Sequence, residues 1–273
     1  MIKDFDHQIL AVHQYAVIDS SVIDYLPPGV ACVPIVPPEM PASAHLMPSL
    51  VHLATLPSAA KAALLGLLQA SWEDNAPPLA PLLIRTDVAP DDLCRHWNRL
   101  RLIAPTPPHK LWLRVHDPRV LHQLLRILTA SQRTRLFGPV ERYTYWADGA
   151  WRADSAASPA KNKQVQGGAI WPWKRVEQIG LINRAIQAAD FEQSPALDLH
   201  SEAAEELIAV ATERFGLAEQ ADLVEFAMRG MTCSRQFYDH PDVAKAIRAG
   251  SDLDSDLADR LALLDARVWT ASA

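Results

Sequence analysis

The chain has 273 residues, of which 49% are hydrophobic and 21% charged, and its formal net charge is −6. These values are typical of a soluble globular protein with a sizeable core, and no stretch approaches the roughly 18 uncharged apolar residues of a membrane span. The N-terminus, MIKDFDHQIL, carries acids early and lacks a signal-peptide core, and three scattered cysteines (Cys32, Cys94 and Cys233) argue against a disulfide framework. We therefore expect a cytoplasmic protein.

The charge is unevenly distributed along the chain. Residues 95–142 contain ten Lys or Arg and two Asp or Glu, whereas residues 190–265 contain six and seventeen. The chain is therefore electrically bipolar, and its two halves either attract each other or present opposite faces to different partners.

Short apolar runs alternate with helical patterns in the first half. Strands are predicted at 15–18, with Asp19-Ser20 able to start a helix, and at 82–84. Between them, the proline-rich stretch 27–41 is not expected to hold regular structure for long. The spacing of Leu46, Leu50 and Leu53 predicts a helix, and so does the spacing of Leu93, Trp97 and Leu100 after Asp91.

The segment LWLRVHDPRVLHQLL, at 111–125, predicts a strand that passes directly into a helix. Leu111, Leu113 and Val115 alternate with polar or aromatic residues, which is strand periodicity. Asp117 occupies the position of a helix N-cap and Pro118 the first helical position. The following apolar residues fall on one helical face.

A hairpin and a helical C-terminal half are predicted next. Strand-like runs at 140–146 and 150–152 flank Asp148-Gly149, a strong turn signal. The small and polar residues of 153–174 indicate a linker, and helical patterns follow at about 175–189, 201–215, 219–230, 241–249 and 253–267. We expect an α/β lobe at 1–152, with a short mixed sheet, flanking helices and the hairpin, and an all-helical lobe at 175–273.

Candidates for chemistry are few. The sequence has no glycine-rich phosphate loop, GxSxG elbow, HExxH or paired CxxC. The group His109, His116, Asp117 and His122 could bind metal or shuttle protons, but surface and capping roles are favoured. Asp19-Ser20-Ser21 is better explained as a helix cap than as a nucleophile. We expect no cofactor, no metal and no catalytic residue.

Two aromatic features suggest binding instead. Arginines from Arg95 to Arg135 are interleaved with Trp97 and Trp112, a pattern that could bind nucleic acid. In this acidic chain, a groove for an acidic protein segment, or for the acidic C-terminal lobe, is favoured instead. Trp171 and Trp173, on either side of Pro172, could anchor a partner or fasten the two lobes together.

Taken in order, several motifs resemble the bacterial domain-of-unknown-function family 4123. They are QYAVIDSS at 14–21, HLMPSLVHL at 45–53, LLIRTDVAPDDLCRHWNRLRLI at 82–103, the 111–125 segment and LFGPVERYTYWADGAW at 136–151. The resemblance covers roughly residues 12–152. The positions that match its pattern include Tyr15, Asp19, Arg114, Asp117, Pro118, Arg119, Gly138 and Pro139.

The resemblance implies a non-enzymatic adaptor or chaperone of type VI secretion. Such a protein holds a toxic effector, often through the effector's N-terminal region, and helps to load it onto the valine-glycine-repeat spike. Two alternatives are a nucleic-acid-binding regulator that uses the basic 95–135 region and, less favoured, a hydrolase that uses His116 and Asp117.

Overall fold

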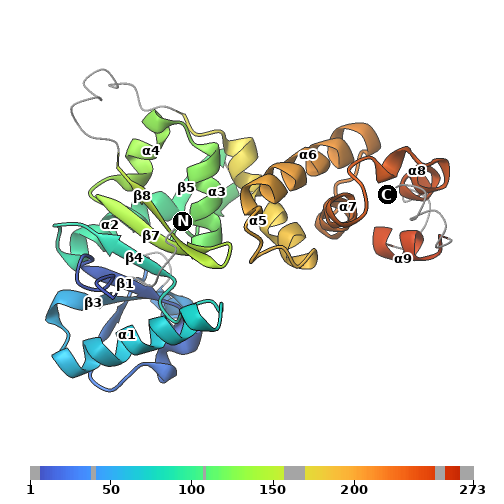
Figure 1. Ribbon diagram of the computed structural model, residues 1–273. Helices are drawn as coiled ribbons and strands as arrows, with labels where there is room; N and C mark the ends of the chain where they lie inside the picture. Colours follow the sequence, from blue (N-terminus) through green and yellow to red (C-terminus); the bar gives the residue numbers. More distant parts are fainter. Residues whose placement is uncertain (1–6, 38–40, 107–108, 157–169, 250–255, 265–273) are drawn as a thin grey trace. The chain divides into compact units, whose positions relative to one another are not determined.

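The computed structural model describes residues 7–37, 41–106, 109–156, 170–249 and 256–264, with the backbone alone at 101–112. The chain divides into two compact units, residues 1–176 (unit 1) and 177–273 (unit 2). The boundary falls inside helix α5 (Trp173–Ala188). Unit 1 contains the strands and unit 2 is helical, which confirms the expected α/β and all-α lobes (Figure 1).

A six-stranded sheet in the order β2-β3-β1-β4-β7-β8 forms the centre of unit 1. Its strands are β1 (Tyr15–Ile18), β2 (Cys32–Pro34), β3 (Ser49–His52), β4 (Leu82–Arg85), β7 (Arg142–Ala147) and β8 (Ala150–Ser155). Every neighbouring pair is antiparallel, where a mixed sheet was expected. Strands β5 (Leu102–Thr106) and β6 (His109–Trp112) pair separately.

Helix α1 (Ser58–Glu73) packs on one face of this sheet. Leu64 and Leu68 of α1 share a buried cluster with Ala16, Val51 and Trp146, which alternate along their strands with residues of the other face. Burial of these apolar side chains, at about 25 cal/mol per Å² removed from water, is the main force that holds α1 to the sheet.

Three helices meet the opposite face, where Tyr143 and Tyr145 of β7 point. They are α2 (Pro90–Arg101), α3 (Pro118–Ile127) and α4 (Ala130–Phe137). Trp97 of α2 donates a 3.2 Å hydrogen bond from its indole to the Tyr143 hydroxyl, and Phe137 of α4 lies 5.2 Å from the Tyr143 ring. Full burial raises the pKa of Tyr143, despite the hydrogen bond from Trp97. Tyr143 and Tyr145 thus share one face of β7, and Trp146 lies on the other.

Two local predictions from the sequence are wrong. The helix predicted from Leu46, Leu50 and Leu53 is replaced by a short 3₁₀-helix, η2 (Pro41–Leu46), and strand β3, because 49–52 has strand partners on both sides. The strand expected through His116 ends at Trp112, and 115–117 form a turn before α3. Further 3₁₀-helices are η1 (Ser20–Tyr25) and η3 (Leu53–Thr55).

Unit 2 contains four helices after α5 among the described residues. They are α6 (Leu197–Phe215), α7 (Gln220–Thr232), α8 (Pro241–Arg248) and α9 (Leu257–Ala262), with the 3₁₀-helix η5 (Phe237–Asp239) before α8. The four α-helices were expected and η5 was not; residues 253–255 and 265–267 of the last predicted helix lie outside the described residues. Among the residues that the structure describes, no helix is both long and apolar enough to cross a membrane.

An aromatic cluster forms part of the core of unit 2. Phe226 of α7 lies 5.0 Å from Phe237 and stacks on Tyr238 at 5.5 Å, and Phe215 at the end of α6 lies 5.6 Å from Phe226. The guanidinium of Arg214 lies 5.1 Å from the Tyr238 ring centroid and forms an ion pair with Asp239. These contacts connect the end of α6 to η5 and thus fix the loop that precedes α8.

Candidate functional site

Asp117 is the N-cap of α3, as the sequence predicted. Its carboxylate accepts the Arg119 backbone N–H at 3.0 Å, and Pro118 begins the helix. The same carboxylate accepts two hydrogen bonds from the Arg119 guanidinium, at 3.1 and 3.0 Å, and lies 3.7 Å from a guanidinium nitrogen of Arg114. One buried carboxylate therefore caps the helix and orients two arginines.

The electrostatics of this group follow from its unequal burial. The Asp117 side chain is 9% exposed, whereas those of Arg114 and Arg119 are 49% and 52% exposed. Burial alone would raise the pKa of Asp117, but the hydrogen bonds and charge of Arg119, together with the charge of Arg114, hold that pKa below its ordinary value. The ionised carboxylate thus keeps both guanidinium groups in place at the surface.

Asp19, which follows β1, lies near enough to Arg114 to interact with its charge. It caps η1 by accepting hydrogen bonds from the backbone and hydroxyl of Ser21, at 2.9 and 2.7 Å. Those bonds, and then the nearby Arg114 and His116, lower the pKa of Asp19 although partial burial opposes the shift. Asp19 therefore lies within electrostatic range of Arg114, which also pairs with Asp117; we call Asp19, Arg114, Asp117 and Arg119 the arginine–aspartate cluster.

Tyr15 lies in β1, and its side chain is part of the core. Its hydroxyl donates a 2.9 Å hydrogen bond to the Val88 carbonyl, and its ring lies 4.9 Å from that of His52. Burial, and then the nearby Cys94, raises the pKa of Tyr15. The geometry therefore gives Tyr15 a structural role at the end of β4, where the chain turns toward α2.

Gly138 and Pro139 form the turn between α4 and β7. Gly138 has φ of +50°, and a Cβ built there would lie 2.2 Å from His96. His96 in turn hydrogen-bonds the Leu136 carbonyl at 3.1 Å, and the Pro139 carbonyl accepts the Thr86 hydroxyl at 2.8 Å. Burial lowers the pKa of His96, and Arg99 adds to that shift while the bond to Leu136 opposes it. Sequence reasoning did not identify His96, which carries no local motif.

Trp171 and Trp173 differ in exposure. Trp171 is 2% exposed, so it is not an exposed anchor; it stacks on Trp173, and Arg135 of α4 lies 6.0 Å from its ring centroid. Gln132 of α4 also donates a hydrogen bond to the Ile170 carbonyl. These contacts attach the segment to α4 within unit 1. Trp173 is half-buried, and its role as a partner anchor remains a prediction.

The basic region shows mainly local contacts. Trp97 is fully buried, which leaves its ring inaccessible for stacking on a base, and the side chain of Trp112 lies outside the described residues. Arg133 bonds the Leu125 and Leu128 carbonyls, and Arg126 bonds Gln123. Within the described residues, no three His, Cys, Asp or Glu side chains are placed to hold a metal ion.

Comparison with known proteins gives one match. The family model described as a domain of unknown function, DUF4123, matches residues 37–135. No curated protein and no solved structure matches the chain. The matched segment contains η2, β3, α1, β4, α2, the β5–β6 pair, α3 and most of α4. Residues 37–135 are therefore similar to a DUF4123 domain. Three members of the arginine–aspartate cluster, Arg114, Asp117 and Arg119, lie within this segment.

Proposed function

We propose that this chain is a non-enzymatic adaptor that binds a type VI secretion effector in the bacterial cytoplasm and helps to load it onto the valine-glycine-repeat spike protein. The observation that carries the proposal is the DUF4123 match over residues 37–135, because that family is generally linked to adaptors of such effectors.

The geometry of unit 1 supports a binding role. Asp117 orients Arg114 and Arg119 at low cost in side-chain entropy, because both guanidinium groups are already fixed before a partner arrives. Arginines of this kind can form paired hydrogen bonds with a carboxylate. We propose that the cluster first stabilises the turn before α3 and, second, contacts an acidic segment of the effector.

The direct test is co-expression of the chain with the toxin encoded beside its gene, followed by affinity purification and size-exclusion chromatography. The adaptor is expected to elute with the toxin as one complex and to raise the amount of soluble toxin, because it binds the folded form. Failure of every neighbouring toxin to associate would reject the proposal.

Variants separate the two roles of the cluster. Arg114→Ala and Arg119→Ala are each expected to lower the thermal unfolding temperature by no more than a few degrees, because each removes one half-exposed partner of Asp117, and to reduce the recovered toxin severalfold. Arg95→Ala is the matched control, since Arg95 is similarly exposed and also pairs with an aspartate, Asp92, on its own helix. Equal toxin recovery in all three variants would place the effector contact elsewhere.

A further inference from the structure

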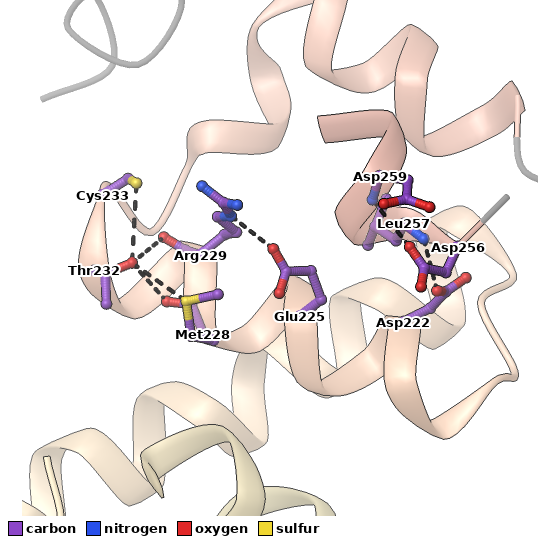
Figure 2. Close-up of polar contacts among 9 residues, drawn as sticks. All are labelled: Asp222, Glu225, Met228, Arg229, Thr232, Cys233, Asp256, Leu257 and Asp259. Atoms are coloured by element: carbon purple, nitrogen blue, oxygen red, sulfur yellow. Dashed lines mark hydrogen bonds and ion pairs between the residues drawn. The ribbon is translucent and has the colours of Figure 1, made fainter. Parts of the chain in front are cut away.

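The last described helix, α9, is attached to the rest of unit 2 by a small set of specific contacts. It has six residues, and it contacts α7 and α8. Asp256 caps its start by accepting the Asp259 N–H at 2.9 Å. Figure 2 shows Asp222 of α7 beside this helix start, where its carboxylate accepts the Leu257 N–H at 2.9 Å.

A buried arginine makes the second polar attachment. The Arg260 side chain is 5% exposed, and one of its guanidinium nitrogens lies 3.6 Å from the Asp222 carboxylate. Its Nε donates a 3.1 Å hydrogen bond to the Ala246 carbonyl of α8. Asp222 therefore recognises both the backbone at the start of α9 and the charge one turn later, while α8 supplies the third contact.

Two leucines make the apolar attachment. Leu257 and Leu261 are separated by one helical turn and both are completely buried, whereas Asp259 and Leu263 are exposed. Buried apolar residues of the helices that α9 contacts include Leu223 on α7 and Val243 and Ile247 on α8. Helix α9 is thus amphipathic, with the pattern Leu-x-x-Arg-Leu on its buried side.

We infer that the surface of α7 and α8 beneath α9 is a binding site for a short amphipathic helix with the pattern Leu-x-x-Arg-Leu, and that α9 occupies it as an internal ligand. We call this the α9-binding surface; Asp222 and the Ala246 carbonyl are its polar groups. A helix of the same chemistry from another polypeptide competes with α9 for it.

Physical reasons favour exchange at this surface. Six residues are too few for a helix to be stable alone, so α9 is helical only while docked. A buried ion pair contributes more to specificity than to stability, because desolvation offsets much of its attraction. The polar contacts therefore select the sequence of the bound helix, and a helix that is stable only while docked can open locally. That the competing helix belongs to an effector rests on the proposed function; the site itself does not.

The test uses the full chain with Leu257→Ser and Leu261→Ser, which releases α9, and a fluorescein-labelled peptide of sequence DLADRLALL, identical to residues 256–264. Fluorescence anisotropy is expected to show saturable binding to this opened chain. A peptide with Ala in place of its arginine is expected to bind at least about tenfold more weakly, because it leaves the Asp222 carboxylate buried without that partner. Asp222→Ala in the opened chain is expected to weaken the original peptide similarly.

Glu225→Ala is the matched control. Glu225 lies on the same helix, one turn after Asp222, but its carboxylate bonds Arg229 at 2.7 Å (Figure 2). This variant is expected to bind the peptide as the opened chain does. Absence of binding by an opened chain with intact helical circular dichroism, or binding indifferent to both Asp222 and the peptide arginine, would overturn the inference.

A second measurement covers the case in which the opened chain does not fold. In the parent chain, excess peptide is expected to accelerate hydrogen exchange at the backbone amides of α9 severalfold, without a change at α6. Unaltered exchange at α9 would also reject the inference. Because no effector is present in either experiment, these outcomes do not depend on the adaptor function.

Discussion

Gly138 shows how one residue controls the turn between α4 and β7. Its positive φ disfavours any side chain, and His96 occupies the space that a Cβ would need. We predict that Gly138→Ala lowers the free energy of unfolding by roughly 2–4 kcal/mol, since backbone strain and steric overlap act together. Urea unfolding followed by tryptophan fluorescence measures the change.

Gly216 provides the control for this prediction. It has φ of +70° after α6, but no atom lies within 4 Å of a Cβ built there. Gly216→Ala is therefore expected to cost only the backbone term, about 1 kcal/mol. Equal decreases in the free energy of unfolding of the two variants would mean that His96 moves aside and that the close contact at Gly138 does not affect stability.

The lowered pKa of Asp117 is expected to make the free energy of unfolding depend on pH. Its pKa in the folded chain lies below the unfolded value of about 3.9, so the ionised carboxylate stabilises the fold. This contribution is fully present above pH 4 and is lost as the pH falls through the folded pKa. We predict that Asp117→Asn, which keeps a helix-capping side chain, loses about 1 kcal/mol at pH 7 because both arginines are half exposed.

Urea unfolding of both chains at pH 7 and pH 3 checks this assignment. The difference between parent and variant is expected to shrink at pH 3, because the Asp117 carboxyl group of the unfolded chain is largely protonated there and protonation then favours unfolding. A difference that stays constant between the two pH values would show that the charge of Asp117 adds nothing to its role as a cap. Asp117→Ala, which removes cap and charge together, is expected to lose more than Asp117→Asn at pH 7.

At the scale of elements, the β7–β8 hairpin depends on Asp148. This residue has φ of +51°, its side chain is fully buried, and its carboxylate accepts two hydrogen bonds from Arg152 at 3.0 and 2.6 Å. We predict that Asp148→Ala destabilises the chain by roughly 2–3 kcal/mol, because it removes the ion pair and adds strain at positive φ. Thermal unfolding followed by circular dichroism measures the loss.

Asp148→Asn separates the two causes. Asparagine tolerates the left-handed region, so this variant loses the charge but not the turn geometry. It is expected to retain roughly half of the stability that Asp148→Ala loses. If the two variants unfold at the same temperature, the ion pair with Arg152 accounts for the whole effect.

The elements differ in how far local sequence determines them. The Asp117-Pro118 cap and the Asp148-Gly149 turn act within a few residues, so the sequence predicted both correctly. Residues 49–52 form a strand only because β1 and β2 pair with them, and no local pattern contains that information. Helix α4, which the sequence analysis did not predict, has a capping box at Thr129 and Gln132 that could have identified it.

The candidate site shows the same limit. Asp117, Arg114 and Arg119 are close in sequence, so their contacts are local. The addition of Asp19 depends on the tertiary fold, since 98 residues separate it from Asp117. The contacts of His96 with Gly138, and of Arg260 with Asp222, likewise join distant segments. Sequence spacing alone could therefore not predict them.

For the whole molecule, the two units differ in charge. Unit 1 contains 18 Lys or Arg and 14 Asp or Glu, whereas unit 2 contains 8 and 18. An acidic segment of the proposed effector would be attracted by the net charge of unit 1 and repelled by that of unit 2. A charge-dependent contact with such a segment is therefore expected on unit 1.

This charge division predicts how effector binding depends on salt. If an acidic segment contacts Arg114 and Arg119, raising the ionic strength from about 0.05 to 0.5 M is expected to weaken the complex about tenfold or more. Over this range the distance at which salt screens two charges falls to a few ångströms. Surface plasmon resonance with the purified toxin measures the change, mainly in the association rate. The Arg114→Ala/Arg119→Ala double variant should show a shallower dependence, because the charges that salt screens are gone. Affinity independent of salt, in both chains, would mean that apolar contacts alone hold the effector.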